Sequence, residues 1–363
     1  MGVPFVQQYS VARYIIHQKV RGRQRYPLVL MLEPLFRCNL ACAGCGKIDY
    51  PEEILNRRLG INECLSAVEE CGAPVVAIAG GEPLIHEEMP QIVANLINRK
   101  KFVYLCTNGI LLRKLIDGYT PSPYLTISIH LDGTRERHDA LASRPGVFDS
   151  AIEAIRLVTL KGFRMTVNYT LYDEVTAEEA STHLDLVMSL GVEGITVSPG
   201  YSYSGASQQG LFLKREHSKQ LFREIFTRGK GHGWKFNHTD LFLDFLAGNQ
   251  SYGCSPWGNP TRNIFGWQRP CYLWADGAHA SSFKALVEDT DWDSYGPGRH
   301  PRCGNCMLHS GFEATAVNDM AAHPLKALYV RLRGPMTEGP MATEFPITTL
   351  DPHRPLRKEK SKG

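Results

Sequence analysis

The chain lacks several features that would place it in common protein classes. No apolar run approaches the length of about 18 residues that a membrane-spanning helix needs. No positively charged start leads into an apolar core with a cleavage site, so we expect a cytoplasmic location. The formal net charge is only +3 over 363 residues, and the basic residues form no stripe with aromatic side chains. These absences argue against a nucleic-acid partner.

The sequence also lacks the pattern of a small secreted domain held by disulfides. Several of its ten cysteines fall in short-spaced groups, which is typical of metal binding in a reducing compartment. The first group, Cys38, Cys42 and Cys45, has the spacing C-x3-C-x2-C and no fourth cysteine nearby. A closed tetrahedral site needs four ligands, whereas three thiolates can hold a [4Fe-4S] cluster with one iron free for an outside molecule. Gly44 and Gly46 would let the backbone wrap around such a cluster. A zinc loop and ordinary buried cysteines are the alternatives.

A second motif lies downstream of the cysteines. The apolar, β-branched run 74–79 predicts a buried strand that ends in a tight turn, Gly80, Gly81, Glu82 and Pro83, with a helix starting soon after. The glycines would allow a ligand to lie against the backbone, and Glu82 offers a carboxylate to a ligand ammonium. Alone, these four residues are also compatible with an ordinary strand-to-helix turn. After the cysteine triad on the preceding strand, they favour a ligand site.

Together the two motifs resemble those of the radical S-adenosylmethionine (SAM) enzymes, over roughly residues 27–200. The resemblance implies a [4Fe-4S] cluster on the three cysteines, SAM on the fourth iron, and the Gly-Gly-Glu-Pro turn beside the methionine amino group. In that family an aromatic residue usually precedes the third cysteine, near the adenine. This chain has Gly44 at that position. Either another group packs against the adenine here, or the pocket is wider.

Strand-like runs alternate with helical patterns in the same region. We expect strands at 28–33, 75–79, 102–105, 125–129, 164–170 and 194–198, and helices at 62–71, 87–99, 149–161 and 176–190. This alternation predicts an α/β fold with a parallel sheet and right-handed crossovers. A partial six-stranded (β/α)6 TIM-like barrel would place the chemistry at the carboxyl ends of its strands.

The chain divides into four expected parts. Residues 1–26 form an amphipathic, basic N-terminal segment, and residues 27–210 form the partial barrel. Residues 211–340 form a cysteine-containing α+β extension, and residues 341–363 form a basic tail that we expect to be disordered.

Polar side chains at the remaining strand ends are expected to line one cavity. The family resemblance implies that residues at the fourth and fifth strand ends contact the SAM ribose, here His130 and Asn168, and Ser198 ends the sixth strand. Cys106 ends the third strand. Because a thiol S–H bond is weaker than a typical C–H bond, Cys106 is a candidate catalytic residue that gives a hydrogen atom to a substrate radical. A buried structural cysteine is the alternative.

Four more cysteines lie in the C-terminal part: Cys254, Cys271, Cys303 and Cys306. The last two have the C-x2-C spacing of a metal knuckle. All four would suffice for a structural zinc ion or a second cluster. Many radical SAM enzymes carry a cysteine-rich C-terminal domain, although the spacing here departs from the commonest pattern of seven cysteines. Packing cysteines are the alternative.

Over almost its whole length, the chain further resembles the radical SAM proteins of hopanoid biosynthesis, notably at 2–9, 32–42, 128–133 and 254–260. This resemblance implies that SAM is a co-substrate whose 5′-deoxyadenosyl radical adds to the terminal alkene of diploptene, a pentacyclic hydrocarbon, to give adenosylhopane. A one-electron reductant such as flavodoxin or ferredoxin would be the protein partner.

Other interpretations of the sequence stay open. The basic residues near both ends, beside the apolar residues of 3–20, are compatible with peripheral contact with the inner membrane, or with ordinary solvated ends. The alternative functions are a different radical SAM enzyme, such as a peptide maturase, and a non-catalytic iron–sulfur protein.

Overall fold

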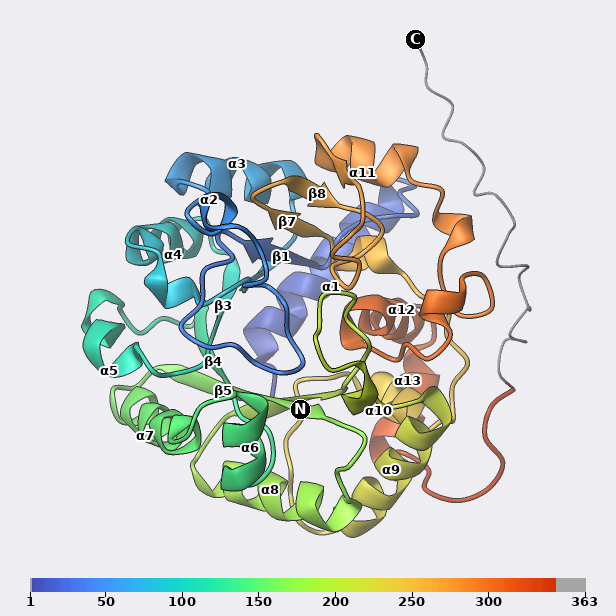
Figure 1. The fold of residues 1–363 in the computed structure, drawn as a ribbon. Coiled ribbons are helices and arrows are strands. Elements are labelled where there is room, and N and C mark those ends of the chain that lie inside the picture. The colour runs from blue at the N-terminus through green and yellow to red at the C-terminus, as the bar shows by residue number, and fades with distance from the viewer. Residues whose placement is uncertain (1, 344–363) are drawn as a thin grey trace.

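A single nine-stranded sheet organises the computed structural model, which describes residues 2–343 (Figure 1). The strand order is β6-β5-β4-β3-β2-β1-β7-β8-β9, and neighbours from β1 to β6 are parallel. The strands are β1 (Val29–Glu33), β2 (Val75–Ile78), β3 (Phe102–Thr107), β4 (Leu125–His130), β5 (Arg164–Leu171), β6 (Gly194–Pro199), β7 (Thr261–Asn263), β8 (Gly266–Gln268) and β9 (His279–Ala280). The six predicted strands are therefore confirmed, and the α/β partial-barrel fold is as expected.

Helices connect the parallel strands and cover the outside of the sheet (Figure 1). They are α1 (Phe5–Val20), α2 (Glu52–Leu55), α3 (Ile61–Cys71), α4 (Met89–Asn98), α5 (Leu112–Leu115), α6 (Arg135–Leu141), α7 (Val147–Leu160), α8 (Ala177–Ser189), α9 (Arg215–Arg228), α10 (Asp240–Leu246), α11 (Phe283–Asp289), α12 (His309–Ala322) and α13 (Pro324–Arg333). The four predicted helices correspond to α3, α4, α7 and α8.

Helical periodicity explains why these connections form. In α7 the buried residues Val147, Ala151, Ile155 and Val158 recur every three or four positions, so one face packs on the sheet. The start of α8 is fixed by Thr176, whose side chain accepts a hydrogen bond from the Glu179 backbone N–H.

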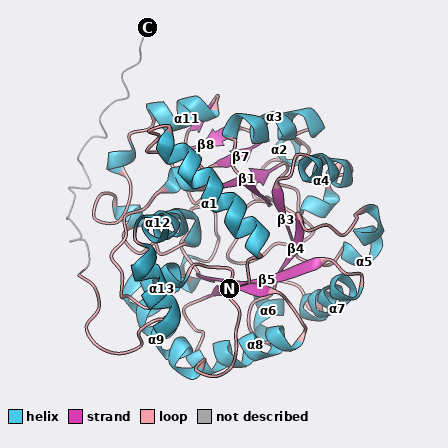
Figure 2. Cartoon of the chain, turned by 180° about the vertical axis from the view of Figure 1, so that it is seen from behind, coloured by secondary structure: helices cyan, strands magenta, loops and turns pink. Residues whose placement is uncertain are grey.

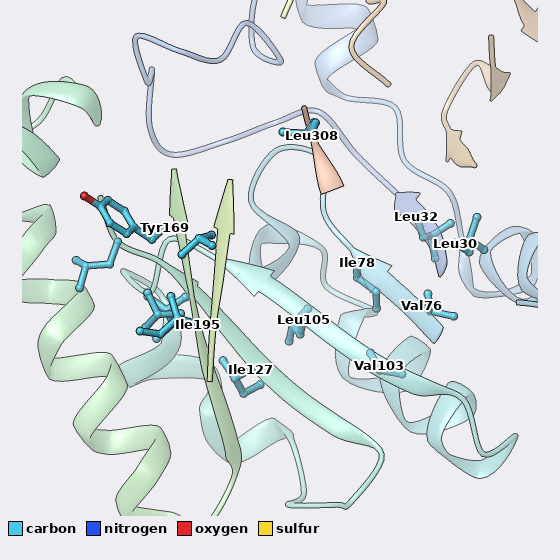
Figure 3. Close-up of a cluster of buried hydrophobic side chains, with 14 of the residues drawn as sticks. Leu30, Leu32, Val76, Ile78, Val103, Leu105, Ile127, Tyr169, Ile195 and Leu308 are labelled. Carbon is cyan, nitrogen blue, oxygen red and sulfur yellow. The ribbon is translucent and has the colours of Figure 1, made fainter. Parts of the chain in front are cut away.

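The two faces of the strands carry different side chains. Alternate residues point outward into the layer of helices and are almost completely buried (Figure 3): Leu30, Leu32, Val76, Ile78, Val103, Leu105, Ile127, Tyr169 and Ile195. Each buried aliphatic side chain of this kind contributes about 1.5–3 kcal/mol to stability. The intervening residues point inward and line a cavity, among them Met31, Ala77, Tyr104, Cys106 and Asn168.

Three short strands of the C-terminal part extend the sheet of the barrel. Strand β7 pairs in parallel with β1, and β8 and β9 follow in antiparallel register. These three strands are only two or three residues long and include polar residues, so no apolar run in the sequence predicts them. The extension thus continues the barrel sheet beyond β1.

Helix α1 lies across the amino ends of the barrel strands (Figure 2). The Tyr104 hydroxyl donates to Gln7 Oε1 (3.2 Å), and Ile15 packs with Leu28 and Ala314 of α12. The predicted amphipathic segment therefore buries one face on the barrel. None of the described helices is long and apolar enough to cross a membrane. Residues 344–363, which include most of the predicted basic tail, lie outside the described part of the chain.

Candidate active site

The loop between β1 and α2 carries the cysteine triad, at the carboxyl end of the sheet. The pKa of Cys42 is raised to about 12, first by burial and then by the charges of Cys45 and Cys38. The pKa of Cys38 is raised to about 11, mainly by burial, with smaller contributions from Glu82 and Cys45. Because the charges of both Cys38 and Cys45 act on Cys42, the three partly buried sulfurs share one site. Such a site fits a positively charged group that binds the sulfurs as thiolates.

The turn after β2 packs directly against this cysteine loop. Gly81 N–H donates to Leu35 C=O (3.0 Å), and Glu82 N–H donates to Arg37 C=O (2.9 Å). A Cβ atom on Gly80, whose φ is +107°, would overlap Leu35 C=O, and one on Gly81 would overlap Arg37 C=O. The glycines are therefore required by the approach of the cysteine loop. Gly80 also lines the cavity, whereas ligand contact at Gly81 and Pro83 stays a prediction.

The Glu82 side chain is almost completely buried and already has protein partners. Its Oε1 accepts from the Thr107 hydroxyl (2.8 Å) and from Leu84 N–H (3.0 Å), and its Oε2 accepts from Asn108 N–H (2.9 Å). Burial raises the Glu82 pKa, and these hydrogen bonds oppose the rise. The side chain fixes the end of β3 beside the turn after β2. Its contact with a ligand ammonium stays a prediction.

Tyr172 occupies the space that an aromatic side chain at position 44 would need. A Cβ atom on Gly44 would lie 2.6 Å from the Tyr172 hydroxyl oxygen. Tyr172, just after β5, is buried and lines the cavity together with Gly44 and Cys45. At Gly46, a Cβ atom would overlap Gly205 C=O. The sequence left two alternatives at Gly44: another group beside the adenine, or a wider pocket. The structure has another aromatic side chain, Tyr172, at this position.

A histidine and a carboxylate lie together at the end of β4, with His130 partly exposed and Asp132 buried. His130 Nε2 lies 2.5 Å from Asp132 Oδ2, and Asp132 Oδ1 accepts from Thr170 N–H (2.7 Å). Burial lowers the pKa of His130, but the Asp132 carboxylate outweighs it and the pKa ends above its usual value. Asn168 Nδ2 lies 3.4 Å from His130 Nδ1, and Asn168 Oδ1 has no partner among the described residues. That oxygen is free to accept from a ligand hydroxyl.

One cavity of about 850 Å³ runs through the barrel from the cysteine loop to α1. Of the predicted site residues, Cys45, Gly80, Cys106, Asn168 and Ser198 line it, whereas His130 does not. Burial raises the pKa of Cys106 to about 12, with Glu82 adding to the rise. Cys106 therefore stays a thiol at neutral pH.

Sequence reasoning missed a buried ion pair beside the cysteine loop. Lys47 Nζ lies 2.8 Å from Glu33 Oε2 at the end of β1, and the two side chains are only 9% and 2% exposed. Burial lowers the Lys47 pKa, but Glu33 outweighs burial and the pKa ends raised. Lys47 lies two residues after Cys45, and no pattern in the sequence predicts that its side chain pairs with Glu33.

A second polar group on the cavity wall was also missed. Ser198 Oγ lies 2.6 Å from His309 Nδ1, and His238 Nδ1 lies 2.9 Å from Glu313 Oε2. The first contact joins β6 to α12, and the second joins the loop before α10 to α12, each across more than 70 residues of sequence. No local pattern could have indicated them.

The four C-terminal cysteines come together below α12. Burial raises the pKa of Cys254 well above its usual value, and the charges of Cys306, Cys271 and Cys303 raise it further. Cys254 Sγ also lies 2.7 Å from where a Cβ atom on Gly311 would stand. Within residues 2–343, no group of three or more His, Cys, Asp or Glu side chains is arranged to hold a metal ion. In a [4Fe-4S] cluster each thiolate binds a different iron, so its cysteines stand farther apart than ligands of one ion.

Two family models match the chain. Residues 32–187 match the radical SAM superfamily, and residues 195–330 match a domain of unknown function, DUF3463. The GTP 3′,8-cyclase of Clostridium perfringens is 28% identical over 157 residues, covering 42% of this chain and 48% of that protein. The Fe-coproporphyrin III synthase of Methanosarcina barkeri is 26% identical over 139 residues, covering 37% and 35%. The chain thus spans half or less of the length of these relatives.

Solved structures share the fold at low sequence identity. SuiB of Streptococcus suis bound to S-adenosylmethionine has a TM-score of 0.64 and 16% identity, covering 83% of this chain and 75% of that chain. The enzyme anSMEcpe with bound AdoMet and the Cp18Cys peptide has a TM-score of 0.54 and 15% identity, covering 85% and 99%.

The cofactor prediction is confirmed at the level of the superfamily, which uses a [4Fe-4S] cluster and SAM. The cysteine loop and the turn after β2 lie together at the carboxyl end of the barrel strands. Residues 32–187 thus match the radical SAM superfamily in sequence, and the partial barrel has the fold of solved radical SAM structures.

Proposed function

We propose that this protein adds the 5′-deoxyadenosyl radical to the terminal alkene of diploptene, as an adenosylhopane synthase. The observation that carries the proposal is the cavity of about 850 Å³ that joins the cysteine loop to α1. Its volume is in the upper range of small-molecule sites. The whole-chain resemblance to hopanoid-biosynthesis proteins supports the same substrate.

The cavity suits a large hydrocarbon along most of its length. Its far half is lined mainly by aliphatic side chains of α1, of α12 and of the residues just before α1: Val3, Val11, Ile15, Ala314, Val317 and Met320. A hydrocarbon has no group that could accept or donate a hydrogen bond, so the site must select it by shape and apolar burial. At about 25 cal/mol per Å² of buried apolar surface, a pentacyclic skeleton would bind well there.

The polar half of the cavity suits the co-substrate. When bound, the reduced cluster supplies one electron to SAM, which yields methionine and the 5′-deoxyadenosyl radical. Asn168 Oδ1, which has no protein partner, would accept from a ribose hydroxyl. Tyr172 would pack against the adenine in place of an aromatic residue at position 44. The barrel wall excludes water from the reacting atoms.

In the proposed reaction, Cys106 supplies the last hydrogen atom. Formation of the C–C bond at the terminal alkene carbon leaves a tertiary carbon radical, which takes a hydrogen atom from the Cys106 thiol. The thiyl radical that remains on Cys106 needs one electron and one proton, and flavodoxin or ferredoxin in the cytoplasm would supply the electron. The raised pKa of Cys106 keeps the transferable hydrogen in place.

Mass spectrometry of an anaerobic reaction tests this function. Reconstituted protein with SAM, dithionite and detergent-solubilised diploptene should give a product with the mass of the hydrocarbon plus deoxyadenosyl and one hydrogen. In D2O the product should carry one deuterium, because the thiol exchanges with solvent. Free 5′-deoxyadenosine without adduct would refute the substrate.

The Cys106→Ala variant should still cleave SAM but should lose the reduced adduct. Cys106→Ser is the matched control for shape, because its O–H bond is too strong to donate the hydrogen atom, so it should fail in the same way. A wild-type yield of reduced product from either variant would remove this role from Cys106.

Peptide modification is the second candidate function. It is favoured by the fold shared with SuiB bound to the precursor peptide SuiA, with a TM-score of 0.63 and 15% identity. In the proposed hydrocarbon enzyme, by contrast, α1 lines the amino end of the cavity with aliphatic residues. If the protein modifies peptides, a peptide substrate should accelerate 5′-deoxyadenosine formation under conditions where diploptene does not.

We also propose that Cys254, Cys271, Cys303 and Cys306 hold a second iron–sulfur cluster. Their mutual proximity supports it, because the charges of Cys306, Cys271 and Cys303 all act on Cys254. Cys303→Ala with Cys306→Ala should lower the iron content by about half in chemically reconstituted protein. Cys64→Ala, at a buried cysteine in the core, is the control. Unchanged iron in the double variant would exclude the second cluster.

A further inference from the structure

The cavity opens to solvent at the end opposite the cysteine loop. In Figure 1 the cysteine loop lies in front of the strands, whereas α1 lies behind them and faces the viewer in Figure 2. Ala12 and Ile16 of α1 and Ala321 of α12 line the cavity and are also exposed to solvent. The opening therefore lies between α1 and the carboxyl end of α12, and we refer to it as the α1–α12 opening.

Exposed apolar side chains lie on α1, which borders this opening, and on α13, which follows α12. On α1, Phe5, Ile16 and Val20 are 79%, 63% and 81% exposed. On α13, which follows α12 after a single residue, Leu325 and Leu332 are 81% and 79% exposed. Figure 2 shows α1, α12 and α13 on the same side of the molecule. Large apolar side chains exposed together in this way mark an interaction surface.

The charge of this surface identifies the kind of partner. The chain has no Asp or Glu before Glu33. The same stretch carries exposed cationic side chains at Arg13, Lys19, Arg21, Arg23 and Arg25. An apolar face beside a cluster of cations, with no acidic residue on α1, complements an anionic lipid surface.

We propose that α1 and α13 dock on an anionic lipid bilayer and that the hydrocarbon enters the barrel from the bilayer through the α1–α12 opening. SAM would bind at the other end, beside the cysteine loop. The inference rests on the proposed function for the identity of the cargo, since a pentacyclic hydrocarbon partitions into lipid. It also predicts the orientation in which the hydrocarbon enters the barrel, because the alkene end must enter first to reach Cys106.

Flotation with phosphatidylcholine–phosphatidylglycerol vesicles tests the docking without any reaction. Wild-type protein should float, and binding should weaken as salt is raised. Val20→Glu with Leu325→Glu should weaken binding by roughly tenfold or more. Leu160→Glu is the matched control, because Leu160 is 86% exposed at the end of α7, on the outside of the barrel. Failure of the wild-type protein to float, or a stable dimer that buries Val20 and Leu325, would overturn the docking.

A tryptophan at the opening tests the route. Ala321→Trp should reduce adduct formation from vesicle-embedded diploptene by roughly tenfold or more, while 5′-deoxyadenosine still forms. Ala322→Trp is the matched control, because Ala322 is the exposed neighbour that does not line the cavity. Ala12→Trp narrows the opening from the α1 side. It gives a second test of the route in case Ala321→Trp does not fold.

The two hypotheses fail differently. Adduct formation by Ala321→Trp and Ala12→Trp at the wild-type rate would overturn the route while leaving the proposed function intact. If wild-type protein forms no adduct even from detergent-solubilised diploptene, the proposed function fails, and with it the hydrocarbon route. Flotation would then still decide whether this face binds lipid.

Discussion

Gly44 and Tyr172 show how a side chain far away in sequence can fill the space beside a glycine. A side chain at position 44 would collide with the Tyr172 hydroxyl, 2.6 Å from the Cβ position. Tyr172 is held by its packing on Phe212, with ring centroids 6.2 Å apart. The missing aromatic residue before Cys45 and the buried tyrosine after β5 are therefore two parts of one arrangement.

This arrangement makes a prediction that a double-mutant cycle can test. Gly44→Ala should lower the free energy of unfolding by about 1–3 kcal/mol, because it forces the buried Tyr172 ring to shift. Tyr172→Phe removes the closest atom, so Gly44→Ala should cost less in that background. The measurement is urea unfolding of anaerobically purified protein for all four species. An equal cost of Gly44→Ala in both backgrounds would contradict the proposed collision.

At the scale of elements, the active end of the barrel depends on contacts between loops that follow different strands. The cysteine loop after β1 is joined to the turn after β2 by two backbone hydrogen bonds. It is joined to β1 itself by the buried Lys47–Glu33 pair, and Lys47 Nζ lies 5.4 Å from the Tyr203 ring centroid in the loop after β6. These contacts order the loop before any cofactor binds.

Removing one charge of the Lys47–Glu33 pair should destabilise the protein more than removing both charges. Lys47→Met leaves the Glu33 carboxylate buried without a counter-ion, which we expect to cost about 3–5 kcal/mol. Glu33→Gln combined with Lys47→Met should recover part of that loss, because no buried charge remains. Thermal unfolding and retained iron per chain would be measured for both. The pair has no such role if the double variant is as impaired as Lys47→Met or more.

For the whole molecule, local sequence patterns predicted the barrel well because its strands are continuous apolar runs. Period-two alternation along β3 also explains why Cys106 points into the cavity, as its prediction required. The short strands β7–β9 had no such signal, since the three residues of β7 are Thr261, Arg262 and Asn263. They form because the exposed edge of β1 supplies unpaired backbone groups.

The site was predictable only as far as its chemistry is local in sequence. The spacing of the triad and the Gly-Gly-Glu-Pro turn identified the cofactor end of the cavity. Tyr172, the Lys47–Glu33 pair and the His309–Ser198 contact depend on tertiary packing, which no spacing encodes. The N-terminal segment is the informative case: its amphipathic character suggested a membrane contact, which stays a prediction, and gave no sign that one face of α1 lines the cavity.

Buried neutral histidines give the whole molecule a predictable sensitivity to acid. His138 and His183 are each 3% exposed, and burial lowers the pKa of each to about 4. In the unfolded chain a histidine has a pKa of about 6.5. Between these values the unfolded state binds protons that the folded state does not, so stability is complete above about pH 6.5 and falls as the pH drops toward 4.

The size of the effect follows from the shift. From pH 7 to pH 5, each histidine should reduce the free energy of unfolding by about 2 kcal/mol. His183→Gln should therefore show a smaller difference in urea-unfolding free energy between these two pH values than the wild type. His217→Gln, at an exposed position on α9, should keep the wild-type difference. If His183→Gln keeps it as well, His183 is not buried in its neutral form, because a histidine that titrated alike in both states would contribute nothing to the pH dependence.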